Sequence, residues 1–176
     1  MFDLAQKTGF DIESLIFCFA IGGIGSVLYQ SLSGAKIKKM STSVQCHSRH
    51  RWHYLALATP IIVFLPLLWF TPLNPIYPAI IAMFAGGIAT QLCRPDLTRC
   101  VWLGGILFAF LYFVFFLTIN VIYPQFLHEV WNMQALTGIH FWGVPLEEIL
   151  FAFSFGMMWS SVYEHLLWYR QSNNVD

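Results

Sequence analysis

Two consecutive glutamates, Glu147 and Glu148, follow Pro145 within an otherwise apolar stretch of the sequence. One reading is structural, because proline favours the first turn of a helix, and the exposed N–H groups and helix dipole there favour acidic side chains. The other reading is chemical, because ionisable groups among apolar residues are costly and commonly serve a function. Two adjacent carboxyls in a poorly solvated place are not expected to ionise together, so one should stay protonated near neutral pH. The pair then offers a proton donor beside a proton acceptor, the two roles of general acid–base catalysis.

A few other residues could assist such an acid pair. Phe155 and Trp159 follow Glu148 by 7 and 11 residues, so the three share one helix face. Aromatic rings on that face could stabilise a carbocation near the acid, although packing is the simpler explanation for any single ring. Thr118 and Asn120, at the end of a preceding apolar segment, could orient the acids or could simply lie at a membrane interface.

The elements that must position these residues are membrane helices. Hydrophobic residues make up 57% of the 176 residues, and the mean hydropathy is +0.62. Charged residues make up only 10%, whereas a soluble domain carries roughly 25%. The apolar residues form blocks of about 20 residues, the length that crosses a bilayer. We expect residues 1–176 to form one all-α polytopic bundle of about five transmembrane helices, at residues 12–32, 54–70, 76–92, 101–122 and 145–167.

The positions of the basic residues predict how this bundle is oriented. Eight of the nine Lys and Arg residues fall on one side of it, which the positive-inside rule assigns to the cytoplasm. These eight are Lys36, Lys38, Lys39, Arg49, Arg51, Arg94, Arg99 and Arg170, and only Lys7 falls on the other side. We therefore expect an integral protein of a bacterial inner (cytoplasmic) membrane, with its N-terminus outside and its C-terminus inside.

The first and last predicted helices resemble each other. When residues 11–32 are aligned with residues 145–166, 7 of 22 positions are identical, and Glu13 aligns with Glu147. An internal repeat would place these two glutamates at the same membrane depth, near the outer face. Three glycine pairs should allow close approach between helices, namely Gly22-Gly23, Gly86-Gly87 and Gly104-Gly105.

The Pro145-Leu146-Glu147-Glu148 core resembles the motif of the small membrane lycopene cyclases, the heterodimeric or fused carotenoid cyclases of bacteria, archaea and fungi. The resemblance is tight over about residues 140–167, and elsewhere it is general, in helix count and hydropathy. It implies acid-catalysed ring closure at the end of an acyclic carotenoid. A proton adds to the terminal double bond, a neighbouring double bond attacks the tertiary cation, and loss of a proton completes the ring without net redox change.

The resemblance also implies residue roles, a substrate and a partner. It makes Glu147 and Glu148 the catalytic acid and base, and the accompanying motif or positioning candidates are Pro145, Glu13, Asn120 and Trp159. The substrate would be an apolar isoprenoid that enters from the bilayer lipid, with no cofactor. The family usually works as two paired units, and this chain carries one full motif beside a degenerate Asp11-Ile12-Glu13-Ser14. A second cyclase-like subunit, identical or different, is therefore an expected partner.

Three other functions fit the same residues. The chain could be a carotenoid hydratase, in which water quenches the cation. It could be a small proton-coupled transporter that uses Glu13, Glu147 and Glu148 as a relay, although carriers usually place their polar groups near the membrane midplane. It could also be a non-catalytic membrane partner that keeps only the fold.

Several other kinds of site are not expected. Cys46, His47, His50 and His53 lie close together, but their spacing matches no familiar zinc or copper site, so no metal ion is predicted. The sequence has no phosphate-binding glycine loop or dinucleotide fingerprint. Its formal net charge of zero gives no indication of a nucleic-acid partner.

Overall fold

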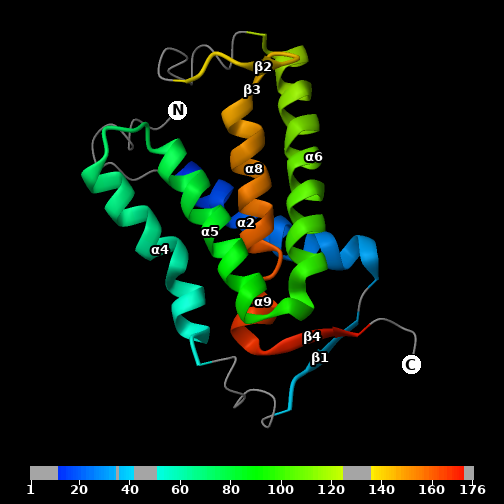
Figure 1. Ribbon diagram of the computed structural model, residues 1–176. Coiled ribbons are helices and arrows are strands. Elements are labelled where there is room, and N and C mark those ends of the chain that lie inside the picture. The colour runs from blue at the N-terminus through cyan, green and yellow to red at the C-terminus, as the bar shows by residue number, and fades with distance from the viewer. Residues whose placement is uncertain (1–11, 35, 42–50, 125–135, 173–176) are drawn as a thin grey trace.

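A computed structural model of the chain describes residues 12–34, 36–41, 51–124 and 136–172 (Figure 1). The described part is mostly helical, which confirms the all-α expectation. Its helices are α2 (Ile12–Ser33), α4 (His53–Phe70), α5 (Ile76–Cys93), the 3-10 turn η2 (Pro95–Leu97), α6 (Thr98–Ile122), α8 (Leu146–Trp159) and α9 (Val162–Leu167). Its short strands form two antiparallel pairs, β1 (Lys36–Lys39) with β4 (Tyr169–Ser172) and β2 (His140–Phe141) with β3 (Val144–Pro145).

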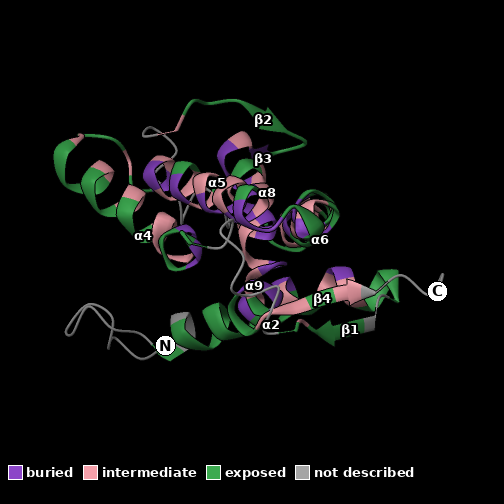
Figure 2. Cartoon of the chain, turned by 60° about the horizontal axis from the view of Figure 1, so that its bottom comes forward, coloured by how far each residue is buried: buried purple, intermediate pink, exposed green. Residues whose placement is uncertain are grey.

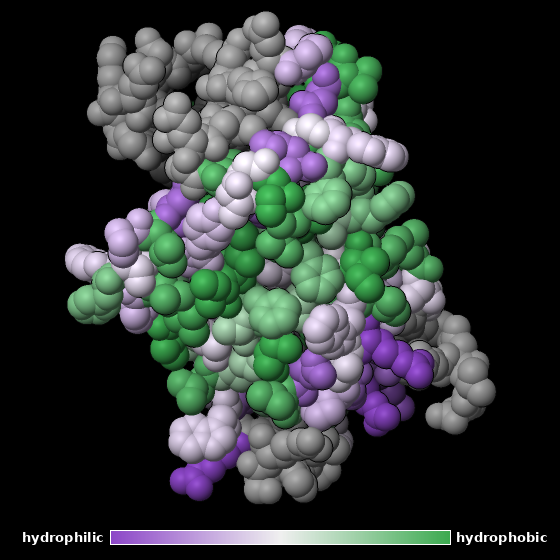
Figure 3. Space-filling model, turned by 45° about the horizontal axis from the view of Figure 1, so that its top comes forward, coloured by the Kyte–Doolittle hydropathy of each residue, from purple (hydrophilic) through white to green (hydrophobic). Residues whose placement is uncertain are grey.

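Four helical segments in this part are long and apolar enough to cross a membrane. They lie in α2, α4, α5 and the continuous stretch of η2 and α6. Hydrophobic side chains cover a broad central band of the face shown in Figure 3, and hydrophilic ones lie above and below it. The length and composition of these helices are consistent with an integral membrane protein. The number of crossings and the orientation of the chain remain predictions.

The predicted fifth helix, residues 145–167, differs from the structure. It is divided into α8 and α9, and the 14 residues of α8 are fewer than the roughly 20 that span a bilayer. The division falls at Ser160 and Ser161, whose hydroxyls donate to backbone carbonyl oxygens, at 3.0 and 3.3 Å. The Ser161 bond is to Met158 of α8, a local contact of the kind that bends helices, whereas the Ser160 bond is to Cys100 of α6.

The core of the bundle lies where α8 packs against α5 on one side and α6 on the other. Figure 2 shows buried residues concentrated where these three helices face one another, whereas α4, which packs against α5, and α2 are more exposed. Small residues make the close approach possible. A Cβ added to Gly104 would lie 2.3 Å from the Oγ of Ser160, and one added to Gly86 would lie 2.5 Å from the Cγ of Pro60. The prediction of close helix contacts is confirmed at these glycines, although Gly23 faces open space.

The helix α2 crosses α6 and α8 instead of running alongside them (Figures 1 and 2). The crossing point lies at Gly22 and Gly25, where an added Cβ would come within 3.2 Å of the Trp159 ring in both cases. Phe155 and Phe108 complete the contact around Gly25. The two segments of the predicted repeat therefore meet face to face at this crossing.

Two positions that the repeat aligns, Gln30 and Glu164, are also joined, because the Gln30 side-chain amide donates to the Glu164 carboxylate. The side chain of Glu13 lies outside the described residues, so its depth relative to Glu147 remains a prediction, as does the repeat.

The β1–β4 pair lies at the end of the bundle opposite the β2–β3 hairpin (Figure 1) and carries Lys38, Lys39 and Arg170. Lys38 and Arg170 are register partners in the β1–β4 pair. Nearby, the guanidinium of Arg94 is fully buried, pairs with Asp96 at 2.7 Å and donates to the backbone oxygens of Glu164 and Tyr169. The clustering agrees with the predicted charge asymmetry along the sequence.

Candidate active site

The β2–β3 hairpin sets the position of the glutamate pair. Its two-residue turn consists of Trp142 and Gly143, both with positive φ angles, 50° and 84°. Positive φ at both central residues is typical of the type I′ turn, whose twist matches that of paired strands. A side chain at Gly143 would also meet Asn120, because an added Cβ would lie 2.8 Å from the Asn120 Nδ2. The chain thus passes directly from a tight turn into Pro145, the residue that precedes α8.

Glu147 is held on the side of the bundle that faces α5. Its Oε1 accepts one hydrogen bond from the Tyr77 hydroxyl at 3.0 Å and another from the Thr137 backbone N–H at 2.7 Å. The residue is only 2% exposed. Three separate segments therefore fix this carboxyl: the start of α5, the segment before β2, and the first turn of α8.

Glu148 faces α6 and is more sparsely bonded. Its Oε2 accepts a hydrogen bond from the Tyr112 hydroxyl at 3.1 Å, and the residue is only 1% exposed. Among the described residues, Oε1 of Glu148 and Oε2 of Glu147 have no hydrogen-bond partner. Buried polar atoms are usually hydrogen-bonded, so two open carboxyl oxygens in neighbouring residues make this pair the candidate site.

An apolar groove adjoins this pair through Tyr112. The groove lies between α2 and α6 and has a volume of about 310 Å³, at the lower end of the roughly 300–1,000 Å³ typical of small-molecule sites. Its lining residues are aliphatic or aromatic: Phe17, Ala20, Ile21, Ile24, Phe108, Leu111, Tyr112 and Phe115. The ring of Tyr112 thus lines the groove while its hydroxyl bonds to Glu148.

Aromatic rings extend from the glutamates along α8. Phe151, Phe155 and Trp159 stack in succession, with centroid separations of 6.3 and 5.6 Å. Phe155 also contacts Phe108 of the groove at 4.8 Å. Phe155 and Trp159 are the two rings that the sequence predicted on the Glu148 face, and Phe155 extends the aromatic lining of the groove.

The candidate residues named from sequence are only partly brought together. Pro145, Glu147 and Glu148 are buried neighbours, whereas Trp159 lies at the α2 crossing, more than two turns along α8. Asn120 packs against the hairpin turn, and among the described residues no hydrogen bond joins it to either glutamate.

Thr118 was a second candidate for orienting the glutamates. Its hydroxyl instead donates to the Val114 oxygen of its own helix. Sequence reasoning missed Tyr77 and Tyr112. The only signal for them was a phenol group within each of two apolar segments, which cannot reveal its partner across the bundle.

The described fold is thus a membrane-type helical bundle with a buried carboxyl pair beside an apolar groove. Residues 74–166 match the sequence model of the lycopene cyclase family. These residues are more than half of the 176-residue chain, so the chain belongs to that family, as the motif resemblance predicted. The match spans α5, α6 and α8 and therefore contains both glutamates and their tyrosine partners. No curated protein and no solved structure matches the chain.

Proposed function

We propose that this chain closes a ring at the end of an acyclic carotenoid, by proton transfer from its buried glutamate pair. The observation that carries the proposal is the bond between Glu148 and Tyr112, since it links a buried acid to the wall of an apolar groove. Family membership supports the choice of a carotenoid substrate. An apolar polyene can enter such a groove from lipid, and Glu148 lies directly behind the Tyr112 side chain that lines it.

Within this proposal Glu148 is the proton donor. Its Oε2 is occupied by Tyr112, so its Oε1 carries the proton that adds to the terminal double bond. The resulting tertiary cation is attacked by a neighbouring double bond within the same molecule. Loss of a ring proton to the carboxylate left on Glu148 restores the acid, so atoms and electrons balance without an oxidant or reductant.

Glu147 is held in place beside the proton donor and acts as a carboxylate. Its Oε1 already accepts two hydrogen bonds, from Tyr77 and Thr137, as a carboxylate does. A negative charge held beside the reacting end would stabilise the cation that forms there. The Phe155 ring contacts Phe108 of the groove lining and would add an aromatic ring close to the cation.

The groove also favours cyclisation over hydration of the cation. Its lining offers one hydroxyl, that of Tyr112, which is committed to Glu148. A bound water needs 2–4 polar partners, and this lining does not supply them. Both glutamates lie at one end of α8 and not at its middle. Carriers usually bind their substrate near the membrane midplane, so this position favours an enzyme that takes its substrate from the lipid over a proton-coupled transporter.

The predicted orientation and partner complete the proposal. The basic end of the bundle would face the cytoplasm of a bacterial inner membrane, and the glutamates would lie near the outer face. A second cyclase-like subunit, identical or different, would pair with the chain in the membrane.

Expression in a bacterium that accumulates lycopene tests the proposal. Wild type should yield cyclic carotenoids, and Glu147→Gln or Glu148→Gln should leave the lycopene unchanged, as measured by chromatography of extracted pigment. Glu164→Gln is the matched control, because Glu164 is also fully buried but lies in α9, beyond the far end of α8. Unchanged lycopene with wild type verified in the membrane, or cyclic product from Glu148→Gln, would refute the assignment. A hydroxylated acyclic product would replace it with the hydratase.

A further inference from the structure

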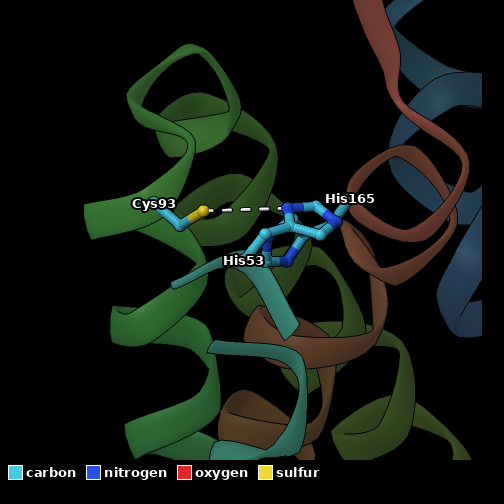
Figure 4. Close-up of side chains that lie close together, drawn as sticks. All are labelled: His53, Cys93 and His165. Atoms are coloured by element: carbon cyan, nitrogen blue, oxygen red, sulfur yellow. Dashed lines mark hydrogen bonds between the residues drawn. The ribbon is translucent and has the colours of Figure 1, made fainter. Parts of the chain in front are cut away.

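Three side chains with metal-binding atoms meet at the basic end of the bundle, away from the glutamate pair. They are His53 at the start of α4, Cys93 at the end of α5, and His165 in α9 (Figure 4). Within the described part of the chain, one ligand atom from each lies within 4.8 Å of the other two. Residues 53, 93 and 165 are far apart in sequence, so no local sequence spacing predicts the cluster.

The cluster is buried and is built from ends of separate helices. The exposed fractions of His53, Cys93 and His165 are 2%, 7% and 0%. The Cys93 Sγ lies 3.8 Å from the His53 Nδ1. Zinc bonds of about 2.3 Å to sulfur and about 2.0–2.1 Å to nitrogen place two such ligands roughly 3.5–3.6 Å apart on one tetrahedral ion. The observed separation therefore needs to shorten by only about 0.2–0.3 Å for both atoms to bind the same metal.

Neighbouring groups hold both imidazole rings in place. The Thr90 hydroxyl lies 3.2 Å from the His165 Nδ1, and the Trp168 ring stacks on His53 with centroids 3.9 Å apart. The two imidazoles meet edge to face at 4.5 Å. Fixed ligand rings with hydrogen-bonded outer partners are typical of protein metal centres.

We propose that His53, Cys93 and His165 bind one zinc-class divalent ion. Two imidazole nitrogens and one thiolate suit zinc, a borderline-soft ion that binds nitrogen and sulfur ligands, and leave a fourth position for water. The ion would join the ends of α4, α5 and α9 at the basic end of the bundle. Its role would be to fix these ends, and the inference does not depend on the reaction proposed for the glutamates.

Metal analysis of the full chain tests the site. The protein is purified in detergent with an affinity tag that lacks His and Cys, incubated with zinc chloride alone, and dialysed. Wild type should retain about one zinc ion per chain, as a three-ligand protein site does. Cys93→Ser should lose most of it, whereas Cys18→Ser, which alters an exposed cysteine in α2, should retain it. Zinc content far below one ion per chain in wild type, or equal content in Cys93→Ser, would overturn the proposal.

Cobalt binding to wild type provides a readout that does not depend on variant folding. Co²⁺ in place of zinc should give the near-ultraviolet charge-transfer absorption of a cobalt–thiolate bond and the visible bands of a four-coordinate ion. Added zinc should abolish both signals. Cobalt binding without the thiolate band would show that Cys93 is not a ligand and would refute the site as proposed.

Discussion

Replacing Gly104 with alanine should destabilise the bundle at the contact between α6 and α8. An added Cβ would lie 2.3 Å from the Ser160 Oγ, 2.4 Å from its Cβ and 3.3 Å from the Gly156 oxygen. Carbon atoms normally pack at about 3.5–4.0 Å, so the end of α8 would have to retreat by roughly 1 Å. The retreat would also strain the reciprocal bonds between Ser160 and Cys100, at 3.0 and 3.1 Å.

The magnitude follows from these contacts. Overpacking costs about 1–3 kcal/mol, and a weakened hydrogen bond adds about 0.5–1.5 kcal/mol. The better helix propensity of alanine returns about 0.5–1 kcal/mol. Gly104→Ala should therefore lower the free energy of unfolding by a net of about 0.5–4 kcal/mol. Gly23→Ala is the matched control, because nothing lies within 4 Å of its added Cβ, and it should be neutral or stabilising by about 0.5–1 kcal/mol.

Thermal unfolding of both variants in one detergent, followed by circular dichroism, measures the difference. Each kcal/mol corresponds to roughly 2–4 °C in Tm for a chain of this size. Gly104→Ala should melt several degrees below wild type, and Gly23→Ala at or above it. An unchanged Tm for Gly104→Ala, or an equal fall for both variants, would refute the close contact of α6 with α8.

Three further changes probe the site. Tyr112→Phe removes the hydrogen bond to Glu148, which becomes worth about 1.5–3 kcal/mol once Glu148 has given up its proton and is charged, so lycopene conversion should slow by roughly 10–100-fold. Tyr123→Phe, at an exposed position after α6, should convert at the wild-type rate. Gly143→Ala places a side chain at a turn residue with positive φ, at a cost of about 1–2 kcal/mol. Both the conversion of lycopene and the Tm should therefore fall, and unchanged values of both would argue against the turn. Ala20→Phe fills the groove and should reduce conversion while Tm stays near wild type, and full conversion would place the substrate elsewhere.

Local sequence features predicted correctly that the two glutamates lie together at the start of a helix. Adjacent positions in a chain stay adjacent in space, so Glu147 and Glu148 had to share one helix turn once Pro145 began the helix. The length of the apolar blocks likewise predicted four helices that are long and apolar enough to cross a membrane, because this length depends on the solvent around a helix and not on its neighbours. The division of residues 145–167 was missed because it depends on a bond from Ser160 to the backbone of another helix.

Contacts between distant segments could not be predicted in this way. The partners of the glutamates, Tyr77 and Tyr112, precede them by 70 and 36 residues. Their identity depends on which faces of α5, α6 and α8 meet, and uniformly apolar helices carry little signal for that choice. The same holds for Cys93 and His165, which join His53 only because three helix ends converge.

The origin of the added proton tests the central claim most directly. Membranes that contain the wild-type chain would be equilibrated in deuterium oxide, supplied with lycopene, and their products analysed by mass spectrometry. If Glu148 delivers a solvent-exchangeable proton to the polyene, each new ring should carry about one deuterium, a gain of about one dalton per ring. Glu148→Gln membranes should form no labelled ring. Cyclic product without deuterium, or labelled rings from Glu148→Gln, would contradict ring closure initiated by this buried acid.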